Sequence, residues 1–141
     1  EILMNGTKNV TDGNVRKDVP GGCTGDEVNK FTREGRTKAE NAMFDWLSRL
    51  LHWRQGNDVV TKGRQVQFIP YNGVYVVARQ NKGKTVLTIL NGKRTENTLS
   101  VNRYAEVIGS ASTATDVITG DKVDISKDVV LPARAAIILE F

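Results

Sequence analysis

Residues 64–90 read RQVQFIPYNGVYVVARQNKGKTVLTIL and carry the clearest structural pattern of the chain. Three runs rich in β-branched and aromatic residues are separated by two turn signals, Pro70-Tyr71-Asn72-Gly73 and Asn81-Lys82-Gly83. Asparagine and glycine tolerate the positive φ angles that tight turns require. The stretch therefore predicts three antiparallel strands joined by short turns.

The same pattern continues to the end of the chain. Further turns are marked by Asn91-Gly92, Gly109-Ser110 and Gly120-Asp121. The predicted strands are 64–69, 74–80, 85–90, 98–101, 106–108, 114–117, 129–131 and 135–141. About eight short strands at this spacing predict a mainly β fold, an antiparallel Greek-key β-sandwich.

One amphipathic helix is predicted before the strands, over residues 37–56. Thr37 and Glu40 have the spacing of a capping box, and Gly56 is suited to end the helix. Apolar residues recur with helical period and form a wide stripe: Ala39, Ala42, Met43, Trp46, Leu47, Leu50, Leu51 and Trp53. A stripe of this size needs a large partner surface.

The segment 5–36 is rich in Gly, Asn, Asp and Lys and is predicted to be a long loop. Loops of this length in compact domains are usually functional or mobile. It follows Glu1-Ile2-Leu3-Met4, which resembles a strand entered midway, so we expect the chain to continue upstream. The predicted organisation is therefore 1–57, a strand, loop and helix, and 58–141, the β-sandwich.

Composition excludes several classes of protein. The net charge is +4 and the pI about 9.3, but no basic run exceeds a pair, which disfavours nucleic-acid binding. No stretch approaches the ~18 apolar residues of a membrane span. The single cysteine, Cys23, cannot form an intrachain disulfide, and one His with one Cys cannot make a zinc site.

Candidates for catalysis are few. His52 is the only histidine, and no Ser or Cys nucleophile is predicted beside it, so we expect a partly packed or surface histidine. Cys23 has no predicted His partner. Paired carboxylates are typical of glycoside hydrolysis, and the loop carboxylates considered for this role are Asp12, Asp18, Asp26 and Glu27. Taken alone, these four are expected to be solvated surface charges.

Ordered motifs along the chain resemble a known family. Nine segments are similar to enzymes of the α-amylase family, glycoside hydrolase family 13. They are 1–4, 14–22, 25–26, 29–32, 35–37, Trp53-Arg54, 103–106, 116–120 and 137–140. Within that family the likeness is to neopullulanases and cyclomaltodextrinases of Bacteroides type. The resemblance implies that 1–57 is the last βα unit of a (β/α)₈ barrel and that 58–141 is a C-terminal sandwich.

The resemblance also implies where the chemistry lies. In this family the nucleophilic Asp, the acid/base Glu and the stabilising Asp lie upstream of the segment matched here, so this chain holds no catalytic residue and is expected to be inactive alone. Asp12 and Arg16 have the spacing of an Asp–Arg pair that contacts sugar in related enzymes, and a loop-internal ion pair is the alternative. Val19 and Cys23 depart from the family, which has Phe and Trp there; this removes sugar-stacking rings.

The parent protein is thus expected to be a retaining α-glycosidase acting on starch, pullulan or maltooligosaccharides, and periplasmic or secreted. No cofactor or metal is expected in this chain, while calcium in the parent stays open. The expected partners are the α-glucan substrate and the upstream barrel, and exposed Ile2, Leu3 and Met4 would favour self-association. The alternative is a free-standing carbohydrate-binding or interaction module, but the resemblance makes its candidate platforms, Tyr71, Tyr75 and Tyr104, structural.

Overall fold

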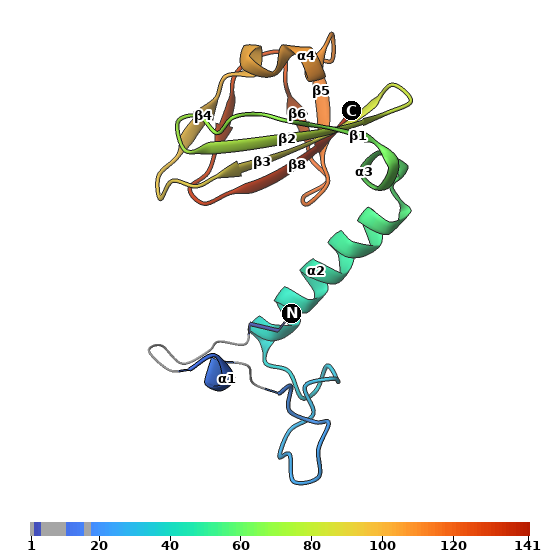
Figure 1. Cartoon of the computed structure of the whole chain (residues 1–141), viewed down its shortest axis with the longest axis vertical. Coiled ribbons are helices and arrows are strands. Elements are labelled where there is room, and N and C mark those ends of the chain that lie inside the picture. The colour runs from blue at the N-terminus through green and yellow to red at the C-terminus, as the bar shows by residue number, and fades with distance from the viewer. Residues whose placement is uncertain (1, 4–10, 16–17) are drawn as a thin grey trace. The chain divides into compact units, whose positions relative to one another are not determined.

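The computed structural model describes residues 2–3, 11–15 and 18–141 (Figure 1). Its contacts divide the chain into two units, residues 1–53 and 54–141. We call these unit 1 and unit 2 and describe each by itself. Helix α2, Lys38–Gly56, belongs to unit 1 over most of its length and ends in unit 2.

Unit 1 contains the short helix α1, Asp12–Val15, an irregular segment over 18–37 and most of α2. The predicted capping box is confirmed. The Thr37 N–H donates to Glu40 Oε2 at 2.6 Å, and the Glu40 N–H donates to Thr37 Oγ1 at 3.3 Å. These two bonds satisfy N–H groups that have no partner inside the first turn of a helix, so the side chains fix where α2 begins.

After the end of α2, unit 2 continues with helix α3, Asp58–Lys62, which was not predicted from the sequence. The Asn57 side chain accepts hydrogen bonds from the N–H groups of Val59 at 2.9 Å and Val60 at 3.4 Å. Both valines are buried. A five-residue helix is too short to show an apolar period, but the N-cap asparagine followed by an acidic residue was a usable signal.

Eight antiparallel strands form two sheets. The larger has the order β1-β2-β3-β8-β5-β6, and the smaller pairs β4 with β7. The strands are β1 Arg64–Gln67, β2 Val74–Asn81, β3 Lys84–Asn91, β4 Asn97–Leu99, β5 Thr113–Asp116, β6 Lys122–Asp124, β7 Val129–Leu131 and β8 Ala136–Glu140. The predicted mainly β, antiparallel sandwich is confirmed, and β8 lies between β3 and β5, strands far from it in sequence.

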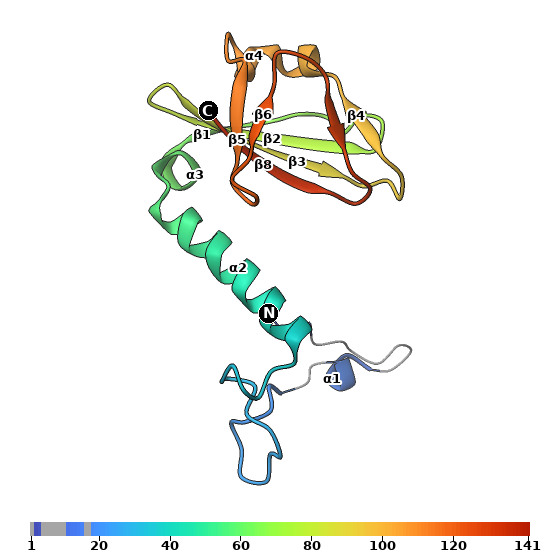
Figure 2. The ribbon, with the colours of Figure 1, turned by 180° about the vertical axis from the view of Figure 1, so that it is seen from behind.

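The turn between β2 and β3 follows the sequence closely. Asn81 pairs with Lys84, and the two residues between them, Lys82 and Gly83, have φ angles of 49° and 76°. Two successive positive φ angles are the requirement of the two-residue turn that suits twisted antiparallel strands. Figure 2 shows the resulting hairpin from behind.

One predicted strand was wrong, and another differs at its ends. Residues 106–108 are not a strand but lie in helix α4, Ala105–Ile108, which follows the 3-10 helix η1, Val101–Tyr104. The predicted strand 98–101 ends at Leu99, because the Val101 N–H donates to Asp128 Oδ1 at 3.1 Å and the chain turns into η1. Strand β6 was missed, since its three residues carry a single apolar side chain.

The core of unit 2 lies between the two sheets and is closed by η1 and α4. Its most deeply buried large side chains are Val76, Leu87, Ile89, Ile125, Leu131 and Leu139. Tyr104 of η1 is buried and packs edge-to-face on Phe68, with ring centroids 4.9 Å apart. Helix α4 lies above β2 and β3 in both ribbon views (Figures 1 and 2). Val107 and Ile108 are both buried in α4, so packing against the core outweighs the β propensity of these two residues over 106–108.

Candidate functional site

The loop of unit 1 contains a turn organised around Asp26. Its carboxylate accepts hydrogen bonds from the N–H groups of Gly21 at 2.7 Å and Cys23 at 3.0 Å. The bond from Cys23 and then that from Gly21 hold the pKa of Asp26 below its usual value. Because two backbone N–H groups stabilise its negative charge, the Asp26 carboxylate is suited to holding a turn and poorly suited to transferring a proton.

Asn29 lies where the two ends of this loop approach each other. A Cβ atom on Gly35 would fall 1.9 Å from the Asn29 carbonyl oxygen, and one on Gly21 would fall 2.6 Å from the Asn29 Cα. Gly21 also has a φ of 111°. Only glycine fits these two positions, so the loop conformation depends on both.

Lys30 and Glu40 join the loop to the start of α2. Lys30 Nζ lies 2.7 Å from Glu40 Oε2, and the two side chains are only 16% and 20% exposed. The Lys30 hydrogen bond, followed by that from the Thr37 N–H, lowers the pKa of Glu40 from 4.5 to about 2. Glu40 therefore serves both the ion pair and the capping box.

Arg36 makes a second connection between loop and helix. Its Nε donates to Asn41 Oδ1 at 2.8 Å, and its Nη1 donates to the carbonyl oxygens of Lys30 at 3.1 Å and Phe31 at 3.3 Å. The guanidinium carbon lies 4.1 Å from the centroid of the Phe44 ring. The planar guanidinium group of Arg36 donates in several directions at once, which lysine cannot do, and it thereby holds the backbone carbonyls of Lys30 and Phe31 in place.

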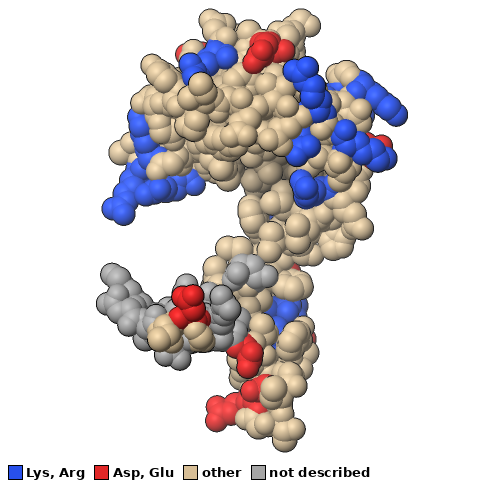
Figure 3. All heavy atoms as spheres, in the orientation of Figure 1, with Lys and Arg blue, Asp and Glu red and all other residues tan. Residues whose placement is uncertain are grey.

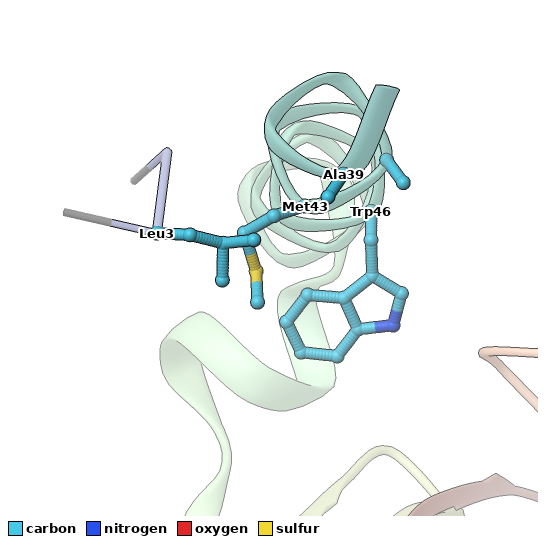
Figure 4. Close-up of a pocket in the computed structure, with 5 residues that line it drawn as sticks. Leu3, Ala39, Met43 and Trp46 are labelled. Carbon is cyan, nitrogen blue, oxygen red and sulfur yellow. The ribbon is translucent and has the colours of Figure 1, made fainter. Parts of the chain in front are cut away.

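A shallow apolar pocket of about 480 Å³, open to solvent, lies beside α2 and is lined by Leu3, Ala39, Ala42, Met43 and Trp46. Figure 4 shows Leu3 approaching Met43, with the Trp46 ring on the same side of the helix. None of the residues of α2, all of which the structure describes, is buried by the described part of the chain. The apolar stripe predicted from the sequence is present, but this chain covers it incompletely.

The tyrosines of unit 2 differ in exposure. Tyr104 is buried and Tyr75 is half-buried, which agrees with a structural role, whereas Tyr71 is 63% exposed. The Arg103 guanidinium carbon lies 4.7 Å from the centroid of the Tyr71 ring, and Arg103 Nη2 donates to the Ile69 carbonyl at 3.3 Å. Its exposure sets Tyr71 apart from the other two tyrosines.

Comparison with known proteins decides the family. The model of the family described as the cyclo-malto-dextrinase C-terminal domain matches residues 65–140. The chain belongs to this family. The α-amylase-family resemblance seen in the sequence is thereby confirmed, and the cyclomaltodextrinase C-terminal domain coincides with the strands of unit 2.

Solved structures agree with this fold. AmyP in complex with maltose matches with a TM-score of 0.62 at 16% identity, over 74% of this chain and 21% of AmyP. An α-amylase from Geobacillus thermoleovorans in complex with acarbose matches with a TM-score of 0.60 at 17% identity, over 74% of this chain and 23% of that protein. The maltogenic α-amylase AmyB from Thermotoga neapolitana gives 0.57 at 20% identity, over 72% and 26%.

This chain thus spans about a fifth to a quarter of the length of the structures that it matches. The matched share of this chain is larger than the cyclomaltodextrinase C-terminal domain alone. At these identities the likeness shows the fold and carries no residue roles.

The predicted sugar-contacting pair can be located only in part. Asp12 is exposed and is the first residue of α1, while Arg16 lies outside the described residues. The other loop carboxylates, Asp18, Asp26 and Glu27, are exposed as expected. Over residues 11–15 and 18–36 the structure therefore brings no pair of carboxylates into a shared, buried site.

His52 lies on the exposed side of α2, and a serine does lie near it. Ser48 Oγ is 3.4 Å from His52 Nδ1, a neighbour that the sequence analysis did not foresee although it is four residues away. The same ring nitrogen lies 2.7 Å from the Ser48 carbonyl oxygen, to which it donates. A nitrogen that carries a proton for this bond cannot accept one from Ser48. Cys23 is a free, exposed thiol.

The described part of the chain contains neither a cluster of potential metal ligands nor a helix that could span a membrane. No group of three or more His, Cys, Asp or Glu side chains among these residues could hold a metal ion. No helix among them is long and apolar enough to cross a membrane. On the face seen in Figure 3, the Lys and Arg side chains of unit 2 lie in separate groups around its margin.

Proposed function

We propose that this chain is the C-terminal part of an α-glucan-hydrolysing glycoside hydrolase, and that its sandwich is an accessory domain of that enzyme. The match of residues 65–140 to the cyclomaltodextrinase C-terminal domain carries the proposal. The maltose, maltotriose and acarbose complexes among the amylases of similar fold support an α-glucan as the substrate class.

The finer proposal is a retaining enzyme of neopullulanase or cyclomaltodextrinase type. It hydrolyses starch, pullulan or maltooligosaccharides with carboxylates supplied by a barrel outside this chain. The chain alone is proposed to be inactive. A periplasmic or secreted location follows from the family resemblance only.

The role proposed for unit 1 is to complete that barrel. The described chain covers the α2 stripe only in part: none of its residues is fully buried, and Leu3 lies over one part of it, beside Met43. Apolar helix faces are buried in stable proteins, so a further partner surface is required. In the proposed enzyme this surface is the rest of the barrel.

Reducing-sugar release from pullulan and maltooligosaccharides tests the proposal. The intact gene product and this 141-residue chain are assayed side by side. Activity of the intact protein alone is the expected result, and an intact protein without activity on any α-glucan would refute the proposal. If the chain alone releases sugar, the location of the catalytic carboxylates is wrong, and the four loop carboxylates become the candidates.

The Asp12–Arg16 pair is tested in the same intact protein. Asp12→Asn and Arg16→Ala are expected to raise KM, because a carboxylate and a guanidinium together bind vicinal hydroxyls. Asp18→Asn is the matched control, since Asp18 is an exposed carboxylate of the same loop. Unchanged kcat and KM in both test variants would show that the pair has no role in binding substrate.

The alternative is a free-standing carbohydrate-binding module. It is favoured by a single observation, the exposed ring of Tyr71. A gene that encodes no barrel with three carboxylates before Glu1 would support this alternative instead.

A further inference from the structure

The turn between β1 and β2 presents an unusual exposed surface. Tyr71 is 63% exposed, and Ile69, two residues before it, is 82% exposed. Tyr71 is the single exposed aromatic residue of unit 2, all of whose residues the structure describes. Large apolar side chains grouped on an exposed turn often mark a binding surface.

The backbone holds the Tyr71 ring in place. The N–H of Tyr71 donates to the Val74 carbonyl at 3.0 Å, and the N–H of Val74 donates back at 2.8 Å. The two residues between them, Asn72 and Gly73, have positive φ angles of 50° and 75°. Because this turn is closed at its base, the ring can bind a ligand without first ordering a loop.

Polar side chains beside the ring are fixed as well. Asn72 Oδ1 accepts from Lys93 Nζ at 2.6 Å, and Asn72 Nδ2 donates to Asn97 Oδ1 at 3.2 Å. The Asn97 side chain donates in turn to the Asn72 carbonyl at 2.8 Å. The Lys93 stem lies so close to Gly73 that a Cβ atom there would fall 2.9 Å from Lys93 Cγ. Neighbouring donors and acceptors therefore form one preorganised cluster.

Arg103 completes this surface. Its guanidinium lies over the Tyr71 ring and gives one hydrogen bond to the Ile69 carbonyl. An arginine has five N–H donors in a planar fork, so most of its donors are free of that bond. None of the ion pairs found among the described residues includes Arg103, which leaves its charge without a carboxylate partner there.

We propose that Tyr71, Arg103 and Asn72 form a surface binding site for an α-1,4-linked glucan chain, separate from the active site of the parent enzyme. The C–H face of a glucose unit packs on the ring face opposite the guanidinium, and hydroxyls of the glucan chain bond at the edge of the ring to the guanidinium and to the amide and ammonium groups beside it. The choice of an α-glucan as the ligand rests on the function proposed above for the parent enzyme. It would hold polymeric substrate on the enzyme outside the cleavage site.

The test is titration of this 141-residue chain with maltoheptaose, followed by two-dimensional NMR. The amide signals of residues 69, 71–74 and 103 are expected to move with ligand, and those of residues 18–37 other than Pro20 to stay. Tyr71→Ala is expected to lower the association constant roughly ten-fold or more, while Tyr71→Phe, which keeps the ring, retains it. Arg103→Gln is expected to weaken binding as well.

Phe31→Ala is the matched control. Phe31 is 65% exposed, so this variant removes an equally exposed ring from the other unit. Loss of binding in Phe31→Ala with full binding in Tyr71→Ala would overturn the proposal, as would equal loss in Tyr71→Phe and Tyr71→Ala. An unchanged spectrum of free Tyr71→Ala shows that this variant folds.

Failure of this inference and failure of the proposed function are distinguishable. An intact enzyme that hydrolyses α-glucans, together with a chain that does not bind maltoheptaose, overturns only the surface site. Binding of cellohexaose in place of maltoheptaose would overturn the α-glucan assignment of the site directly.

Discussion

Asn91 connects the two sheets of the sandwich through its side chain, and replacing it tests the account of the fold. The residue is only 3% exposed. Its Nδ2 donates to the carbonyl oxygens of Thr95 at 3.1 Å, Pro132 at 2.8 Å and Leu131 at 3.4 Å. Its Oδ1 accepts from the Lys93 N–H at 3.1 Å. One amide thus satisfies backbone groups of the turn after β3, of β7 and of the residue that follows β7.

The expected cost of Asn91→Ala follows from these bonds. A net hydrogen bond contributes about 1 kcal/mol, and a buried polar group left without a partner costs about 1–3 kcal/mol. With two amide N–H donors and one acceptor lost, the free energy of unfolding is expected to fall by about 2–4 kcal/mol. This is a large share of the roughly 5–15 kcal/mol of a typical domain.

Asn91→Asp separates hydrogen bonding from shape, because the two side chains have nearly the same volume. In this variant an ionised carboxylate would direct oxygen at the carbonyls of Thr95 and Pro132, which disfavours the charged form in the folded state. The pKa of the new carboxyl is therefore raised by folding. A group with a raised folded pKa costs little below its unfolded pKa, and its cost grows as the pH rises toward the folded value.

Urea denaturation of wild type, Asn91→Ala and Asn91→Asp at about pH 4 and about pH 7, on either side of the usual carboxyl range, measures this difference. The deficit of Asn91→Asp relative to wild type is expected to grow by up to about 1.4 kcal/mol per pH unit above about pH 4. The deficit of Asn91→Ala is expected to be the same at both values. If Asn91→Asp is as stable as wild type at the higher pH, or its deficit does not change with pH, the amide does not have the role argued here.

Two further predictions concern helix starts. Asn57→Ala is expected to destabilise unit 2 by about 1 kcal/mol more than Asn57→Ser in urea denaturation, because serine keeps the N-cap acceptor. Both variants lose the hydrogen bond to Glu140, so this bond does not affect the comparison. Equal stabilities of the two variants would show that the cap contributes nothing. The Thr37 amide resonance reports the protonation of Glu40 and is expected to titrate near pH 2 and not near 4.5, because the Lys30 bond and the cap stabilise charged Glu40. This stabilisation of the folded state is present above pH 4.5 and is lost as the pH falls through about 2. In Glu40→Gln that titration should vanish, and a wild-type midpoint near 4.5 would contradict the ion pair.

Local chemistry explains what the sequence could predict. The capping box needs only residues three apart, and the turn at Lys82 and Gly83 needs only two positive φ angles, so both were visible in the sequence. The wrong strand at 106–108 shows the limit of such reasoning. Val107 and Ile108 favour strands by type, but the bond from the Val101 N–H to Asp128, 27 residues away, redirects the chain before them.

The exposed surface at Tyr71 could not be predicted from the sequence, because it too depends on contacts between distant residues. Exposure depends on what lies across from a side chain, and the sequence does not give that. Tyr104 and Tyr71 are both tyrosines close to Arg103 in the structure, yet one is 2% exposed against Phe68 and the other 63% exposed. In contrast, the exposure of Asp26 was predicted from its place in a Gly-rich loop, although its bonds to the Gly21 and Cys23 N–H groups were not.

The two units differ in how far the described chain buries their apolar residues, and this bears on what each contributes. Unit 2 has a closed core in which Leu87, Leu131 and Leu139 have no exposed surface. In unit 1 the loop is fixed to α2 by Lys30 and Arg36, which are polar contacts, while the apolar stripe of the helix is only partly covered and holds no fully buried residue. Hydrophobic burial is the dominant source of folding free energy, so unit 2 has its own source of stability, whereas unit 1 requires a further apolar surface. That difference is what a barrel element joined to an accessory sandwich would display.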